Sequence, residues 1–155
     1  MGSYNFKSVG KTKEQTFLDQ LVQSKQPVGI KTPLKLGETE GILSMHYSLA
    51  DQVHDNFRNL LLTNWGERLQ QYSLGANLGP LLSDYATQDD FDSAAITRIN
   101  AAVQKWMPYI NLQDYISEID STQSRGSGMI RLTITYGIPA LQVEKRALQL
   151  SLRVM

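Results

Sequence analysis

The spacing of apolar residues changes at Pro108, and this change constrains the fold more than any other feature of the sequence. Before Pro108, apolar side chains recur every three or four positions over residues 49–63 and 91–106, which predicts two long helices that each bury one face. After Pro108, apolar and polar residues alternate, most strictly over residues 130–136, which predicts half-buried antiparallel strands. Helices followed by antiparallel strands predict an α+β fold: a single domain with two main helices packed on a small antiparallel sheet, formed mainly by the C-terminal strands.

Further strands are predicted on either side of the strand at residues 130–136. Alternation over residues 110–118 predicts one, with a slip near Tyr115 that is typical of a β-bulge, and a last alternating run over residues 148–154 predicts another. In these patterns Ile96 of the second helix and Ile116 of the first strand belong to the buried faces. The expected breaks are a hairpin loop at residues 124–128 and the end of the middle strand at Gly137.

The N-terminal part of the chain has a different character. Residues 12–24 predict a short helix, whereas Pro and Gly lie so close together over residues 26–41 that we expect a loop with one short extended piece around Ile30. We therefore divide the chain into an arm, helix and loop extension at residues 1–40 and the main domain at residues 41–155.

Composition excludes several classes of protein. The 155 residues contain 15 Lys and Arg against 15 Asp and Glu, and this balance argues against a nucleic-acid partner. The absence of cysteine excludes disulfides and thiolate metal sites, and no apolar run is long enough for membrane insertion.

The neutral total conceals an uneven distribution of charge. Residues 1–35 contain six Lys and two acids, whereas residues 36–155 contain nine basic and thirteen acidic residues. We expect the arm to reach an acidic neighbour, and the acidic remainder of the chain to receive a basic segment from another protein.

No catalytic or metal-binding pattern stands out. His46 and His54 have no ligand spacing and are interpreted as ordinary surface or loop histidines. A glycosidase needs two carboxyl groups, one with a raised pKa, but aspartates at the start of a helix have lowered pKa values because they meet the positive end of its dipole. We therefore expect no enzyme, catalytic residue, cofactor or metal; the carboxylates considered are Glu67, Asp84, Asp89, Asp90 and Asp92.

One segment of the chain resembles a known protein family. Residues 57–69, FRNLLLTNWGERL, and the following GANL at residues 75–78 resemble the core of the baseplate wedge family of contractile phage tails, which is also represented in type VI secretion systems. The signature positions are Gly66, Glu67, Arg68, Gly75 and Leu78, and the resemblance covers about residues 45–155. Met107-Pro108-Tyr109 stands where the family usually has Glu-Pro-Arg, so that only Pro108 matches.

The resemblance implies a structural role. Such proteins are similar in fold to the interlocking domain of the sheath protein, and they start the sheath by accepting extended arms from sheath subunits. The implied partners are the tail sheath, other baseplate wedge proteins and, as further candidates, tail tube or hub proteins, with several copies per baseplate. The implied location is the virion tail baseplate, assembled in the host bacterial cytoplasm.

The residues themselves suggest how an arm is accepted. A terminal strand offers unpaired N–H and C=O groups at a sheet edge, where another strand can add. An alternative is a tail-associated peptidoglycan hydrolase that uses Glu67 and one of the nearby aspartates, because some members of the family have been labelled lysozymes. A third is a wedge adaptor that binds neighbouring baseplate proteins but does not touch the sheath. The expected partner-binding residues are Gly66, Glu67, Arg68, Pro108, Tyr109, Leu148, Leu150 and Leu152.

Overall fold

The computed structural model describes residues 13–14, 26–37, 42–84, 88–120 and 129–153. They fall into two compact units, residues 1–48 and 49–155, which are considered separately. Of the predicted helix at residues 12–24, only Lys13 and Glu14 are described, and both are helical; the predicted hairpin loop at residues 124–128 lies outside the described residues. Within the described ranges, no helix has the length and apolar character that crossing a membrane requires.

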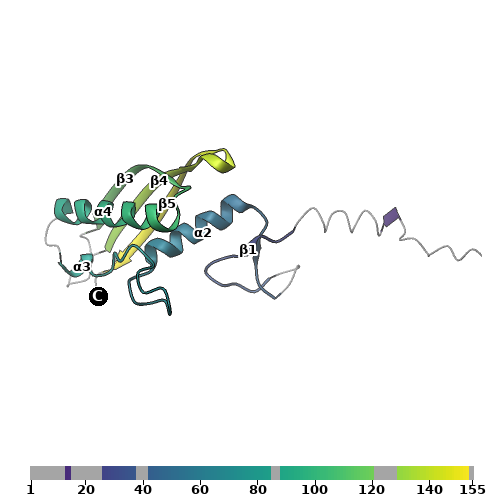
Figure 1. Cartoon of the computed structure of the whole chain (residues 1–155), viewed down its shortest axis with the longest axis horizontal. Helices are drawn as coiled ribbons and strands as arrows, with labels where there is room; N and C mark the ends of the chain where they lie inside the picture. The colour runs from purple at the N-terminus through teal and green to yellow at the C-terminus, as the bar shows by residue number, and fades with distance from the viewer. Residues whose placement is uncertain (1–12, 15–25, 38–41, 85–87, 121–128, 154–155) are drawn as a thin grey trace, which may run out of the picture. The chain divides into compact units, whose positions relative to one another are not determined.

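The second unit is built from helices followed by an antiparallel meander, so the predicted α+β fold is confirmed (Figure 1). Its three-stranded sheet has the order β3-β4-β5, and the helices pack on one face of it. The elements are α2 (Leu49–Leu62), α3 (Leu81–Asp84), α4 (Gln88–Trp106), β3 (Asn111–Asp120), β4 (Met129–Ile138), the 3₁₀ turn η1 (Pro139–Leu141) and β5 (Val143–Arg153).

The core lies between this sheet face and the two long helices. Phe57 of α2 meets Tyr136 of β4 edge to face, with ring centroids 4.9 Å apart. Leu132 and Leu150 are register partners on β4 and β5, and both are buried. Burial of each such side chain stabilises the fold by about 1.5–3 kcal/mol.

The structure departs from the predicted pattern in β3, where the bulge lies between Leu112 and Asp114, earlier than expected. The extra residue reverses the alternation, so that Tyr115 faces the helices and Ile116, predicted to be buried, is 50% exposed. Ile96 of α4 is likewise 39% exposed.

β4 also continues through Gly137, which was expected to end it. A Cβ there would lie 2.7 Å from the carbonyl oxygen of Glu144 in β5. The same oxygen accepts a hydrogen bond from the Gln113 side chain of β3. Glycine therefore lets three strands approach closely at this point.

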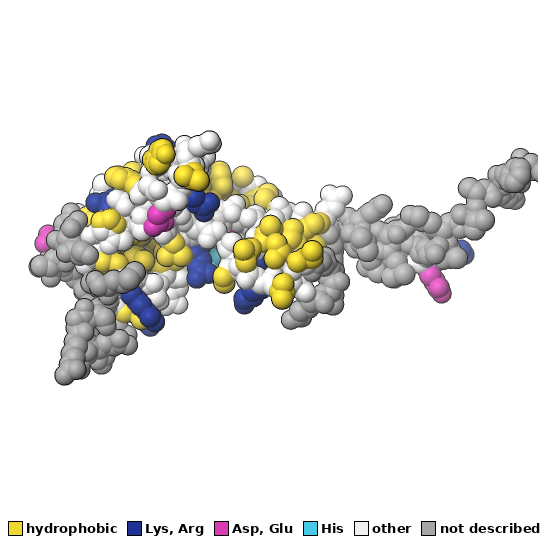
Figure 2. All heavy atoms as spheres, turned by 90° about the horizontal axis from the view of Figure 1, so that it is seen from below, with side chains coloured by type: hydrophobic (Ala, Val, Ile, Leu, Met, Phe, Trp, Pro, Cys, Tyr) yellow, Lys and Arg dark blue, Asp and Glu magenta, His cyan; other side chains and the backbone are white. Residues whose placement is uncertain are grey.

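The first unit contains a small hairpin. β1 (Gly29–Ile30) pairs with β2 (Met45–His46) in antiparallel fashion, which confirms the extended piece predicted around Ile30. Large apolar side chains such as Leu34, Leu36 and Ile42 are exposed on it, and Figure 2 shows hydrophobic side chains gathered on its surface. The division predicted at residues 40 and 41 stays a prediction.

Candidate functional site

The Gly-Glu-Arg motif lies in the loop that follows α2, and Asn64 organises this loop. The Asn64 side-chain amide donates a hydrogen bond to Oε1 of Glu67 (2.8 Å), and the Asn64 backbone N–H donates to Oε2 (3.0 Å). The side-chain oxygen of Asn64 accepts from the backbone N–H of Gly79 (3.0 Å). The hydrogen bond from the Asn64 backbone is the main reason that the pKa of Glu67 is lowered, with the side-chain hydrogen bond next. Glu67 is therefore ionised, and both of its carboxylate oxygens accept hydrogen bonds that shape the loop.

Two glycines of the motif have positive φ angles, +88° at Gly66 and +113° at Gly75. A Cβ at Gly66 would meet nothing, whereas one at Gly75 would collide with the backbone carbonyl of Thr63, at 2.7 Å from its carbon atom. Gly75 therefore permits a close backbone approach, and Gly66 permits only a turn.

The loop closes on itself and presents apolar side chains to solvent. The Gly66 N–H donates to the carbonyl of Tyr72 (2.8 Å), and the Trp65 indole donates to the carbonyl of Gly75 (3.1 Å). Three large side chains of this loop are exposed, at 57% for Trp65, 89% for Leu69 and 67% for Tyr72. We call these three residues the loop ridge; the sequence carries no signal for it, because no periodicity marks a loop.

A groove joins this loop to the end of α4. It has a volume of about 310 Å³ and brings Arg68 of the Gly-Glu-Arg motif together with Trp106 and Tyr109, which flank the Pro108 region. The Trp106 indole donates to the carbonyl of Ser73 (3.3 Å), which ties α4 to the loop. Pro108 lies in the chain between two lining residues of the groove, Met107 and Tyr109.

The predicted residues of the terminal strand lie elsewhere, on β5 at one edge of the sheet. The side chains of Leu148, Leu150 and Leu152 are buried in the core. Within the part of the chain that the structure describes, β5 pairs with β4 alone. Among the described residues, one side of the β5 backbone therefore has no strand partner, and any role of these leucines toward a partner would act through the backbone.

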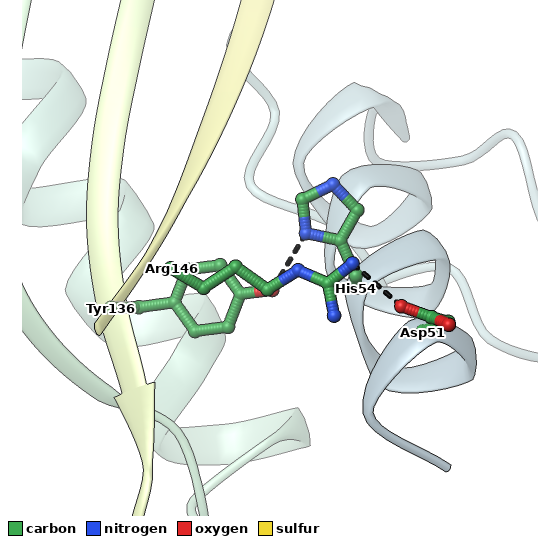
Figure 3. A network of polar contacts seen from close by, with 4 residues as sticks. All are labelled: Asp51, His54, Tyr136 and Arg146. Atoms are coloured by element: carbon green, nitrogen blue, oxygen red, sulfur yellow. Dashed lines mark hydrogen bonds and ion pairs between the residues drawn. The ribbon is translucent and has the colours of Figure 1, made fainter. Parts of the chain in front are cut away.

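A polar network connects α2 to the sheet (Figure 3). His54 Nδ1 lies 2.7 Å from the Tyr136 hydroxyl, and the Arg146 guanidinium of β5 forms a 2.7 Å ion pair with Asp51. Burial lowers the pKa of His54, and the positive charge of Arg146 lowers it further. His54 is thus a packed helix residue rather than the surface or loop histidine expected, and the 82-residue separation from Tyr136 leaves no local sequence signal for it.

Two of the carboxylates considered for catalysis, Glu67 and Asp92, accept hydrogen bonds that hold the fold. Asp92 accepts hydrogen bonds from the Ser117 hydroxyl (2.7 Å) and the Tyr115 hydroxyl (3.3 Å), which tie α4 to β3. Burial is the main cause of the raised pKa of Tyr115, and Asp92 adds to it. Among the described residues, no group of three or more His, Asp or Glu side chains is placed to hold a metal ion.

Comparison with known proteins identifies similar folds. No protein-family model and no curated protein matches the chain. A chain of the anti-feeding prophage (AFP) baseplate, solved with 6-fold symmetrisation, matches with a TM-score of 0.58 and 21% identity, over 70% of this chain and 82% of that one. A protein named a putative tail lysozyme from Geobacter sulfurreducens matches with a TM-score of 0.47 and 17% identity, over 69% of this chain and 90% of that one. The chain therefore has the fold of a chain in a prophage baseplate, and the predicted resemblance to baseplate proteins is confirmed at the level of the fold.

Proposed function

We propose that the chain is a structural component of a contractile-tail baseplate that joins the baseplate wedge to the tail sheath. In this role it templates the first sheath ring, because an extended arm of a sheath subunit adds as a strand to the open side of β5. It acts in several copies within a larger assembly of different proteins. The shared fold with a prophage baseplate chain supports the baseplate assignment.

The observation that carries the sheath role is the geometry of β5. An eleven-residue edge strand with exposed Gln149 and Ser151 offers a row of backbone donors and acceptors, and such a row in a free protein favours pairing with another chain. Leu148, Leu150 and Leu152 hold β5 against the core from the other face. The backbone can therefore bind an arm while these side chains fix its position.

The test changes only exposed side chains of β5. A charge directly opposite a like charge on the added strand destabilises pairing by up to about 1 kcal/mol. We therefore expect one of two paired changes, Gln149→Glu with Ser151→Glu or the same two positions changed to Lys, to reduce the number of sheathed tails while baseplates still form; which pair does so depends on the charge of the arm. Electron microscopy of particles assembled with each variant measures the number of sheathed tails and the number of baseplates.

Ile116 provides the matched control, because Ile116, Thr133 and Gln149 lie in one row across the sheet and Ile116 is on the opposite edge. Ile116→Glu and Ile116→Lys should leave sheath assembly unchanged. Sheaths of normal number and length with both β5 pairs would contradict strand addition, and purified baseplates that lack this chain would contradict the baseplate role.

The geometry gives little support to the alternative, a peptidoglycan hydrolase. A general acid needs a raised pKa and a position that excludes water, whereas Glu67 is exposed, receives two hydrogen bonds from Asn64 and has a lowered pKa. We expect the purified protein to leave peptidoglycan intact. Turnover that Glu67→Gln abolishes, with the folded structure retained, would overturn the structural proposal.

A further inference from the structure

The loop ridge is an unusual surface for a polar loop. Leu69 is 89% exposed, although the loop is held by its own hydrogen bonds from Gly66 to Tyr72 and from Gln71 to Arg68. Isolated exposed apolar residues are common, but three large ones on one hydrogen-bonded loop beside a groove are typical of a binding surface. A loop that is already ordered loses little conformational entropy when it binds.

Three cations lie around the ridge and the groove, and Glu67 is the acid of the loop. Arg98 lies 5.8 Å from the centre of the Trp65 ring and donates to the carbonyl of Asn77. Lys105 lies 4.9 Å from the centre of the Trp106 ring and donates to the Ser73 hydroxyl (2.8 Å). Arg68 lines the groove, whose lining contains no Asp or Glu. The contacts of Arg98 and Lys105 are thus with neutral groups, and Glu67, the acid of this loop, has both oxygens bonded to Asn64.

We propose that the loop ridge and the adjoining groove bind an acidic amphipathic segment of a neighbouring protein. Apolar side chains of that segment pack on Leu69 and Tyr72, and its carboxylates meet Arg68, Arg98 and Lys105. Ring faces hold two of these cations in place, which prepares them for a carboxylate. This surface is separate from β5, so the inference does not depend on the sheath proposal.

Two other occupants of this surface can be considered, the N-terminal residues of the same chain and a second copy of the protein. Residues 1–25 of this chain contain four Lys and two acids, so they would meet the three cations with a like charge. A second copy would have to present its own acidic apolar segment, and self-association measures this directly.

The experiment selects a partner by its chemistry. A phage-displayed library of random peptides is selected on the immobilised full-length protein, and binders to the double variant Arg68→Glu, Leu69→Ser are removed. Because both side chains are exposed, the double variant should unfold at the same temperature as the unchanged protein. The recovered peptides should be net acidic, with apolar residues at helical spacing.

Fluorescence anisotropy with a recovered peptide then quantifies binding. Arg68→Glu and Leu69→Ser should each weaken it about tenfold, added salt should weaken it further, and the control Ile116→Ser should leave it unchanged. Recovery of basic peptides only, or of none that distinguishes the double variant, overturns the proposal. So does a dimer of the unchanged protein in sedimentation velocity that Leu69→Ser dissociates, because the ridge would then be a contact between copies.

Discussion

The two positive-φ glycines of the loop after α2 allow backbone strain to be separated from backbone collision. Gly66→Ala and Gly75→Ala both place a Cβ on a residue whose φ is positive, +88° and +113°. A Cβ at Gly66 would have no atom within 4 Å, whereas one at Gly75 would overlap the Thr63 carbonyl at the end of α2. The pair therefore differs chiefly in the collision.

The expected losses in the free energy of unfolding follow from two effects, backbone strain at positive φ and the collision of the new Cβ. A non-glycine residue at positive φ costs about 1–2 kcal/mol, and replacing glycine by alanine returns about 0.4–1 kcal/mol by restricting the unfolded chain. Gly66→Ala should therefore lower the free energy of unfolding by about 1 kcal/mol. Forcing an extra carbon into a packed place costs about 1–3 kcal/mol more, so Gly75→Ala should lower it by about 2–4 kcal/mol.

Urea unfolding measures both values, and Trp65 reports on the loop because its indole is bonded to the carbonyl of Gly75. Gly75→Ala should also change the native tryptophan emission, while Gly66→Ala should leave it similar to that of the unchanged protein. Equal losses in the two variants, or a loss below about 1 kcal/mol in Gly75→Ala, would refute the close approach of Gly75 to Thr63.

Two further predictions concern the core and its polar network. Leu150→Ala should lower the free energy of unfolding by about 2–5 kcal/mol because it empties a buried site, whereas the exposed neighbour change Gln149→Ala should alter it by less than about 0.5 kcal/mol in the same urea titration. Because the pKa of His54 is lowered from 6.5, the unfolded chain binds more protons than the folded one, so stability should fall as the pH drops below about 6.5. Melting temperatures from pH 8 to pH 5 should show this fall in the unchanged protein and a smaller one in His54→Gln; an identical fall would show that His54 is not its source.

Periodicity predicted the order and type of the main elements because each buries a regular face. It failed where one extra residue moves the side chains of the following residues to the opposite face of the sheet. The bulge between Leu112 and Asp114 turns Ile116 outward and Tyr115 inward, and the sequence does not distinguish a slip at Gln113 from one at Tyr115. Gly137 illustrates the same limit, because its role as a close strand contact depends on the carbonyl of Glu144, which comes from another strand.

The candidate site was predictable in part. The Gly-Glu-Arg motif and the region of Pro108 were recognisable in the sequence, but the groove that brings Arg68 to Tyr109 depends on how α4 packs beside the loop. The loop ridge gave no signal because exposure, rather than spacing, defines it. Leu148, Leu150 and Leu152 were recognised as strand residues, but the sequence alone did not separate a core-facing role from a partner-facing one.

The charges of the two sheet edges refine the expectation drawn from net charge. Averaged over residues 36–155 the chain is acidic, which favours a basic arm. However, β5 carries one acid against three basic residues, of which Arg146 is engaged by Asp51, whereas β3 carries three acids, of which Glu118 is engaged by Arg131 of β4, and neither Lys nor Arg. Since charges are screened beyond about 8 Å at physiological ionic strength, an arm responds to the strand that it joins rather than to the average. An acidic arm therefore fits β5 and a basic one fits β3, and in the assembly test the Glu pair at Gln149 and Ser151 should be more disruptive than the Lys pair.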